Sequence, residues 1–272
     1  VVLHSTFDPP EFPDRRLKRL KEALSMCDRV LAHSPVDLNR LKDTGLIENT
    51  ALIPHGLLDW SGREAADDVN KGVIQNAGYF LLSSFGFFLP HKGLEQLLDA
   101  IAILKEQGLP VRLKMLNAEY PAEISRAAIS EIRSKIEKLG LADCVVIDTT
   151  YYNDGDCLER LAQSRLIIFP YQQTNESSSA AVRHAVASGA PVAVTPLSIF
   201  EDVRDAVIQL PGAKPEELAE GIGRIMSWDQ MQWRNYWDAA NSWRRAHYHV
   251  VIGKRLSAMI KALYKDLLRR AS

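Results

Sequence analysis

Short apolar segments alternate with amphipathic segments along most of the chain. Brief apolar runs bounded by turn residues predict strands, and apolar positions at helical spacing predict helices. This alternation is typical of an α/β fold with parallel sheets and helical crossovers. The predicted strands cover residues 1–5, 28–32, 50–53, 79–85, 111–116, 145–147, 166–169, 192–194 and 207–210. The predicted helices cover 17–26, 36–42, 94–107, 124–139, 157–162, 215–226 and 250–268, with another beginning at 177–179, a turn at 86–93 and a loop at 197–205.

The pattern divides the chain into two units and a tail. Residues 1–60 supply three strands, too few to bury both faces of a parallel sheet, so we expect an incomplete Rossmann-like domain. It starts like a strand entered in its middle, which suggests that a missing N-terminal segment or a partner completes the sheet. The polar residues 61–75 predict a linker. Residues 76–227 predict a doubly wound Rossmann-like domain, and residues 228–272 predict helices without strands.

The stretch 169–196 contains the strongest functional signal. Three serines follow Glu176, and a serine at a helix start accepts hydrogen bonds from the free N–H groups there. Those N–H groups and the helix dipole make a small anion site that suits a phosphate, and it would comprise Ser177, Ser178, Ser179 and Ala180. A carboxylate repels a phosphate. We therefore expect Glu176 to bind a hydroxyl-rich group attached to that phosphate, such as a sugar.

Composition narrows the class of protein. Of 272 residues, 46% are apolar and 25% charged, as in a globular protein with a sizeable core, and the net charge of −1 gives no indication of nucleic-acid binding. The three cysteines form no metal-binding pattern, which favours free thiols in a reducing compartment. No apolar run approaches the length of a membrane span, and no leader pattern is present. We therefore expect a cytoplasmic protein without a metal.

The tail combines tryptophans with basic residues. Trp228, Trp233, Trp237 and Trp243 lie close together in the sequence, and we interpret them as packing residues that anchor a helix across another domain. The last predicted helix has basic residues at 254, 255, 261, 265, 269 and 270. They predict either a solvated face or attraction to an anionic membrane surface, which would place the protein peripherally on the inner face of the membrane.

Three motifs, taken in order, resemble one known family. The segments CDRVLAHSPVDLNRL…IPHG, SSFGFFLPHKGLEQLLDAI and NESSSAAVRHAVASGAPVAVTP resemble the retaining GT-B glycosyltransferases of family 4, the glycosyl transferases group 1. The resemblance spans nearly the whole chain. It implies two Rossmann-like domains facing a cleft, with a UDP- or GDP-sugar donor held mainly by residues 76–227. It also implies that no metal or other cofactor is needed, and that the final helix crosses back to the first domain.

The resemblance assigns donor-binding roles, with two departures from the family pattern. Lys92 matches the phosphate-binding lysine, and Gly86 matches the glycine of the same loop. The arginine that usually follows this glycine is replaced by Phe87, so half of the cationic clamp is absent or supplied elsewhere. Glu176 matches the first of two paired acids, which contacts the sugar hydroxyls. The second acid, a ribose ligand, is replaced by His184, which predicts either a ribose contact or simple packing.

Further matches lie at other strand ends. His4 matches the family's histidine near the reacting centre, although a strand-end histidine without a chemical role explains it equally well. His33 and Ser34 match a strand end that faces the cleft. Tyr151 and Tyr152 follow a strand whose end contacts the base in relatives.

Together these features predict a retaining glycosyltransferase that moves a sugar from a nucleotide-diphosphate donor to a saccharide or lipid-linked acceptor, in surface polysaccharide biosynthesis. In the family's same-face displacement the leaving phosphate takes the acceptor proton, so the protein positions the reactants and stabilises charge. Two alternatives remain. A non-catalytic scaffold with a degenerate donor pocket would bind no nucleotide sugar. A nucleotide-sugar epimerase would release a free epimer, and it would need further acids and histidines in the cleft.

Overall fold

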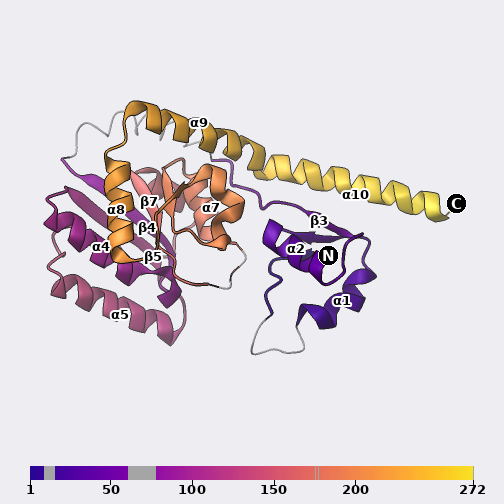
Figure 1. The fold of residues 1–272 in the computed structure, drawn as a ribbon, viewed down its shortest axis with the longest axis horizontal. Helices are drawn as coiled ribbons and strands as arrows, with labels where there is room; N and C mark the ends of the chain where they lie inside the picture. Colours follow the sequence, from indigo (N-terminus) through magenta and orange to yellow (C-terminus); the bar gives the residue numbers. More distant parts are fainter. Residues whose placement is uncertain (9–15, 61–77, 175, 177, 272) are drawn as a thin grey trace.

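The computed structural model describes residues 1–8, 16–60, 78–174, 176 and 178–271. The predicted linker at 61–75 and Ser177 lie outside the described residues. The described residues form two separate parallel sheets, a smaller one of three strands and a larger one of six, and a helical tail that runs past both (Figure 1).

The smaller sheet is built from the first 60 residues. Its strand order is β1-β2-β3, and both pairings are parallel. Helix α2 begins after Ser34, whose side chain accepts a hydrogen bond from the amide of Asp37. Val30, Leu41 and Leu46 belong to the core between the sheet and its helices. The elements are β1 (Val2–Leu3), α1 (Leu17–Ser25), β2 (Val30–Ala32), α2 (Pro35–Asp43) and β3 (Thr50–Leu52).

The larger sheet has the strand order β6-β5-β4-β7-β8-β9, and every pairing is parallel. From β4 the chain moves outward in one direction through β5 and β6, and from β7 in the other direction through β8 and β9. The order therefore reverses between β4 and β7, and open α/β sheets bind ligands beyond the carboxyl ends of strands at such a point. The strands are β4 (Phe80–Phe87), β5 (Val111–Ala118), β6 (Val145–Asp148), β7 (Leu166–Phe169), β8 (Val192–Val194) and β9 (Ile208–Gln209).

Helices cover both faces of this sheet. Ile168 packs into one core cluster, whereas its neighbours Ile167 and Phe169 pack into the other, because alternate side chains of a strand point to opposite faces. The first cluster includes residues from α4 (Leu94–Glu106), α5 (Glu123–Lys138) and α8 (Pro215–Met226). The second includes residues from α6 (Asp154–Ala162), α7 (Ala180–Ala187) and the 3-10 helix η3 (Ser198–Ala206). The predicted doubly wound architecture is thus present.

The tail forms two consecutive helices, α9 (Gln230–His247) and α10 (His249–Ala271). Figure 1 shows α9 lying along the larger unit and α10 continuing over the smaller one. Trp228 and Trp233 pack against the core of the larger unit, and Ile252 of α10 packs against Leu31 and Ile53 of the smaller sheet region. A hydrogen bond joins the segment after β3 to the end of α9, since the amide of Leu57 donates to the carbonyl of His247 at 2.7 Å. No helix of the described chain is long and apolar enough to cross a bilayer.

The structure corrects two predicted boundaries. Gly86 and Phe87 lie within β4 and not in the turn that follows, because the ladder with β5 continues to the pairs Gly86 with Asn117 and Phe87 with Ala118. The segment predicted as a loop at 197–205 is instead the 3-10 helix η3. Ile199, Phe200 and Val203 are buried there, and this apolar face fixes the helical path.

Candidate functional site

A cavity of about 440 Å³ opens beyond the carboxyl ends of β4 and β7, where the strand order reverses. It is lined from four directions, by the end of β4, the turn after it, the segment before α6 and the start of α7. The described residues predicted for the donor site all line it: Gly86, Lys92, Tyr151, Glu176, Ser178, Ser179, Ala180 and His184. Residues distant in sequence therefore meet at one ligand-sized space.

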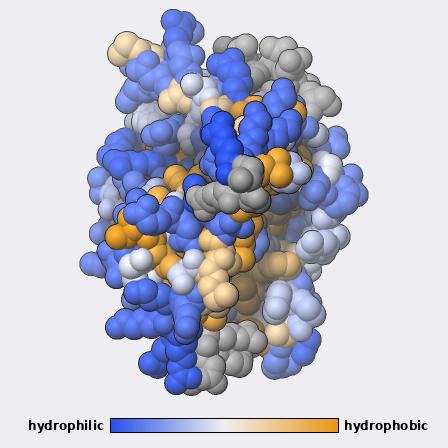
Figure 2. All heavy atoms as spheres, turned by 90° about the vertical axis from the view of Figure 1, so that its right-hand side faces the viewer, coloured by the Kyte–Doolittle hydropathy of each residue, from blue (hydrophilic) through white to orange (hydrophobic). Residues whose placement is uncertain are grey.

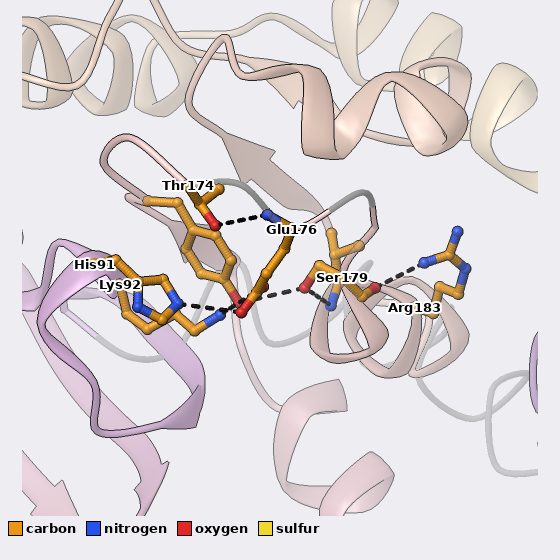
Figure 3. Close-up of polar contacts among 8 residues, drawn as sticks. His91, Lys92, Thr174, Glu176, Ser179 and Arg183 are labelled. Atoms are coloured by element: carbon orange, nitrogen blue, oxygen red, sulfur yellow. Dashed lines mark hydrogen bonds and ion pairs between the residues drawn. The ribbon is translucent and has the colours of Figure 1, made fainter. Parts of the chain in front are cut away.

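Glu176 forms the polar centre of this cavity. Lys92 Nζ lies 3.3 Å from Glu176 Oε2, and His91 Nε2 lies 3.4 Å from Oε1 of the same carboxylate. Figure 3 shows Glu176 between this basic pair and the first residues of α7. The amide of Glu176 donates to Thr174 Oγ1 at 3.1 Å, which orients the loop. Burial lowers the pKa of His91, the charge of Lys92 adds to this effect, and Glu176 opposes it.

The turn that presents Lys92 is held against the end of β7. The 3-10 helix η2 (Pro90–Lys92) is followed by Gly93, which has a left-handed φ of +68°. A Cβ atom at Gly93 would overlap the carbonyl oxygen of Pro170, so only glycine allows the two backbones to approach this closely. The amide of Gln172 donates to the carbonyl of His91 at 2.9 Å. Lys92 is only 8% exposed, and its Nζ lies 3.9 Å from the ring centroid of Tyr171.

The start of α7 forms the opposite wall. Ser179 is the N-cap residue and its side chain accepts a hydrogen bond from the amide of Val182, which confirms the predicted helix start. The amides of Ala180 and Ala181 lie in the first turn, where N–H groups have no acceptor within the helix. Tyr171 Oη lies 3.3 Å from Ser179 Oγ.

Arg183, one turn into α7, holds the N-cap residue of this helix in place. It donates to the carbonyl of Ser179 at 2.8 Å and forms a buried ion pair with Asp202. Burial lowers the pKa of Arg183 to about 10, so the guanidinium stays charged at neutral pH.

Aromatic side chains and His184 define the far end of the cavity. Phe87 and Tyr151 stack with ring centroids 6.0 Å apart and an interplanar angle of 13°, and Tyr151 is 78% exposed. His184 Nε2 lies 3.0 Å from Asp154 Oδ1, and its Nδ1 lies 3.2 Å from the carbonyl of Ala180. Both ring nitrogens are therefore engaged while the ring still lines the cavity. Burial raises the pKa of the nearby Cys157 to about 12, so this residue is a thiol and not a thiolate nucleophile.

His4 lies in a second, adjoining cavity of about 490 Å³. The two cavities share four lining residues, namely Asp154, Ser178, Ala180 and His184. His55, His249 and Arg183 also line the second cavity. Burial and the charge of Arg183 lower the pKa of His55 to about 3. The structure thus does not bring His4 to Lys92 and Glu176, although it places His4 next to the same helix start.

Some expectations were incomplete or differ from the structure. Ser34 does not line either cavity, because it is buried as the cap of α2 and donates to Asp37 Oδ2 at 2.7 Å. His91, Tyr171 and Arg183 were not predicted. Their positions beside Lys92, after β7 and within α7 were visible in the sequence, but only the folded backbone shows which of them face the ligand space.

The family model described as Glycosyl transferases group 1 matches residues 80–227, and no curated protein matches the chain. Sucrose-phosphate synthase from Thermosynechococcus elongatus is similar at 19% identity with a TM-score of 0.72, over 97% of this chain and 67% of that one. HepE of Anabaena, in a complex with UDP, is similar at 18% identity with a TM-score of 0.78, over 96% and 71% of the two chains.

An α,α-trehalose-phosphate synthase (UDP-forming) from Burkholderia vietnamiensis is also similar, at 11% identity with a TM-score of 0.76, over 98% of this chain and 67% of that one. These structural similarities confirm the predicted GT-B type α/β fold. The family match covers more than half of the residues and includes both sides of the cavity. The chain therefore belongs to the glycosyl transferases group 1 family and is a glycosyltransferase.

Proposed function

We propose that this glycosyltransferase moves a sugar from a nucleotide-diphosphate donor to a hydroxyl group of a saccharide or lipid-linked acceptor, with retention of the anomeric configuration. The observation that supports this most directly is the meeting of three groups in one cavity. They are the Lys92 ammonium, the Glu176 carboxylate and the first turn of α7. The first and third suit a diphosphate, and the second suits the hydroxyls of the attached sugar.

The diphosphate would lie between Lys92 and the amides at the start of α7. Lys92 is held by the ring of Tyr171 and by Glu176, so it is preorganised to stabilise negative charge that develops on the leaving group. Phe87 replaces the usual arginine, and Arg160 is another basic residue that lines the cavity. Its guanidinium lies over the ring of Tyr152, from where it would supply the second positive charge.

The nucleoside would occupy the aromatic end of the cavity. The stacked pair of Phe87 and Tyr151 offers a flat apolar surface for a base, and the exposed carboxylate of Asp154, which holds His184, offers an acceptor for a ribose hydroxyl. HepE was solved with UDP and with UDP and glucose, and the similar trehalose-phosphate synthases are described as UDP-forming. These relatives support a UDP-sugar ahead of a GDP-sugar.

Retention is carried over from the family resemblance, and the few carboxylates in the cavity bear on the route by which it would occur. Among the described residues that line the cavity, Glu176 and Asp154 are the acids, and both are engaged with basic side chains. We therefore infer a same-face displacement without a covalent glycosyl-enzyme intermediate. The bond between the acceptor oxygen and the anomeric carbon forms as the bond from that carbon to the phosphate oxygen breaks, and the acceptor proton passes to the leaving phosphate. The protein contributes positioning and charge stabilisation, with no metal or other cofactor in this donor cavity.

The last helix, α10, bears on where the acceptor would be presented. Exposed basic residues of α10 alternate with exposed apolar ones. Figure 2 shows hydrophilic and hydrophobic residues side by side on the face toward which α10 points. We infer that α10 lies against an anionic membrane surface, where a lipid-linked acceptor of surface polysaccharide synthesis would be presented.

Calorimetry and turnover together test the proposal. We expect one of UDP-, GDP- or ADP-sugars to bind the chain, and Lys92→Ala and Glu176→Ala to lower turnover by about 10²–10³-fold each with little change in melting temperature. Lys105→Ala is a matched control, because Lys105 is an exposed lysine paired with Asp143 away from the cavity.

Each alternative gives a different outcome. Binding of none of these nucleotide sugars would support a scaffold, and release of a free epimer would support an epimerase. Unchanged turnover in both variants would remove Lys92 and Glu176 from the site.

A further inference from the structure

The second cavity, of about 490 Å³, is lined by basic side chains from both units of the chain. His4 follows β1 and His55 lies shortly after β3, while His249 is the first residue of α10. Arg183 reaches the same cavity from α7 of the larger unit. Asp154 is the one acid among the described residues that line it, and a histidine already engages this carboxylate. The cavity is therefore rich in groups that can donate to an anion.

The histidine cluster, which comprises His4, His33 and His55, lies at one edge of the smaller sheet. The three strands are parallel and adjacent, so their carboxyl ends lie at this edge, and one of these imidazoles follows each of them. His33 and His55 stack with ring centroids 3.5 Å apart, and His4 is nearly parallel to His55 with centroids 5.9 Å apart. Ring nitrogens point outward in the plane of each ring, so a stack presents them side by side along a wall. Such a wall suits a ligand with several oxygen atoms.

Positive charge dominates the surroundings of His55. Burial, followed by the charges of Arg183 and of three neighbouring histidines, lowers the pKa of His55 to about 3. Asp202 offsets part of the charge of Arg183 through their ion pair, and Asp37 accepts a hydrogen bond from Ser34 at the helix start after β2. An anion in the cavity would balance the remaining positive charge, because an opposite charge stabilises the protonated form of a histidine.

Arg183 also holds an unused N–H group. The residue is 7% exposed, and its two terminal nitrogens are engaged by the carbonyl of Ser179 and by Asp202. Its Nε has no hydrogen-bond partner among the described residues. A buried N–H group without a partner costs free energy, so this one points to an oxygen that a ligand would supply. Figure 3 shows Arg183 on the opposite side of the α7 start from Lys92 and Glu176, away from the site proposed for the diphosphate.

We propose that the second cavity binds a phosphate group carried by the acceptor. A phosphate group presents three strong acceptor oxygens, which suits hydrogen-bond donors that approach from several elements better than a planar carboxylate does. An arginine and the amides at a helix start are both common phosphate partners. Here Arg183 and the first turn of α7, at Ala180, form one wall, and the imidazoles of His4 and His55 form another.

The position of this site connects it with the proposed transfer. The two cavities share Asp154, Ser178, Ala180 and His184. A phosphate in the second cavity would hold the acceptor beside the sugar of the nucleotide donor, so that an acceptor hydroxyl faces the anomeric carbon. The phosphate acts as a handle and takes no part in the bond changes. This inference rests on the proposed function for the role of the bound molecule, whereas phosphate binding is measured without any transfer.

Calorimetry with phosphate monoesters tests the site. Glucose 6-phosphate and farnesyl phosphate carry the same group on a soluble sugar and on a prenyl lipid, and glucose and farnesol are their controls. We expect at least one ester to bind with one site per chain, at least about tenfold more tightly than its control, because charged hydrogen bonds are lost with the phosphate. Tighter binding of glucose 6-phosphate would identify a phosphorylated sugar as the acceptor class, and tighter binding of farnesyl phosphate a lipid-linked phosphate.

Substitutions locate the bound phosphate. His4→Gln and His249→Gln change exposed residues, so both variants should keep the parent melting temperature. Each should weaken ester binding by about tenfold, the effect of losing one hydrogen bond to a charged group. Arg126→Gln is the matched control, because this exposed arginine pairs with Glu123 and lines neither cavity. Lys92→Ala should leave ester binding unchanged, since Lys92 lines only the other cavity.

The outcomes separate this site from the proposed function. Ester binding that is lost in Lys92→Ala and kept in both histidine variants would place the phosphate in the diphosphate site and overturn the proposal. Absence of ester binding, or equal weakening in Arg126→Gln, would overturn it as well. A chain that binds an ester and no UDP-sugar would keep the phosphate site and lose the proposed transfer, and a chain that binds UDP-sugar and no ester would do the reverse.

Discussion

Gly93 combines a left-handed backbone with close contact to a neighbouring backbone carbonyl, that of Pro170. We expect Gly93→Ala to lower the free energy of unfolding by at least about 1 kcal/mol more than Gly140→Ala. Gly140 has a similar φ of +64°, but a Cβ there meets no atom of the described residues within 4 Å. The control thus measures backbone strain alone, and the difference measures the overlap. Urea unfolding gives both values, and equal losses would show that the Lys92 turn adjusts freely.

The lowered pKa of His247 predicts that stability depends on pH. Burial lowers its pKa, Arg255 and Arg183 add to this effect, and the carbonyl of Trp243 and the charge of Asp205 oppose it. The unfolded chain, with a histidine pKa near 6.5, then binds more protons than the folded chain at mildly acidic pH. This contribution is fully present above that pKa and is lost as the pH falls toward the folded value.

We expect His247→Gln to make the loss of stability between neutral and mildly acidic pH shallower, by at most about 1.4 kcal/mol per pH unit. Unfolding measured in urea across this range gives the slopes for the variant and the parent chain. Identical slopes would contradict a lowered pKa at this position.

At the scale of elements, Ser179 links local helix chemistry to the donor site. Ser179→Ala removes the N-cap of α7 and should cost about 1 kcal/mol of stability. Because the same turn would hold the diphosphate, we also expect about fivefold weaker binding of UDP, if a comparable free energy is lost from the bound state. Asp229→Ala is the control, since Asp229 caps α9 in the same way but does not line either cavity. Similar UDP affinity in the two variants, measured by calorimetry, would show that Ser179 stabilises α7 without contributing to ligand binding.

The hydrophobic pattern predicted most elements, because strands and helices that bury one face leave a clear period in the sequence. It placed α8 and β7 at the observed bounds, and it found the start of α7 from the serine run. The pattern did not predict the end of β4. The last residues of that strand are extended because β5 continues beside them, and a neighbouring strand leaves no local signal in the sequence. The segment of η3 was missed, although its buried residues Ile199, Phe200 and Val203 have a helical spacing.

The candidate site was predictable only in part for the same reason. Lys92 and Glu176 lie next to local signals, a turn before a helix and a serine run, and the fold brings them within 3.3 Å. The histidine cluster depends on the parallel alignment of three short strands, which no local pattern specifies. Likewise, the contacts of Tyr171 with Lys92 and Ser179 follow from where β7 ends relative to β4.

At the scale of the whole molecule, the tail connects the two sheets. Tyr248 forms a bridge with Leu57 at the junction of α9 and α10, and Ile252 then packs against the smaller sheet region. Beyond this contact α10 projects away from the rest of the chain (Figure 1), and most of its described side chains are exposed. Exposed large apolar residues occur there at Ile260, Tyr264, Leu267 and Leu268.

The spacing of these apolar residues places them on one stripe of α10, and Lys254, Lys261 and Lys265 form a second stripe beside it. A helix with adjacent apolar and basic stripes binds at the interface of an anionic bilayer, with about 1 kcal/mol contributed by each lysine near the surface. We therefore expect the chain to cosediment with vesicles rich in phosphatidylglycerol and not with phosphatidylcholine vesicles, and added salt should weaken the binding.

Charge removal on α10 makes this prediction quantitative. The double variant Lys261→Gln and Lys265→Gln should lose about 2 kcal/mol of membrane-binding free energy, which is roughly a thirtyfold decrease in partition coefficient. A control with Lys105→Gln and Lys138→Gln removes the same net charge from exposed positions of the larger unit. If both double variants lose binding to the same extent, the attraction comes from overall charge, and α10 is not the docking element. If only the α10 variant dissociates, the basic stripe contacts the membrane directly, because the two proteins differ only in where the charge was removed.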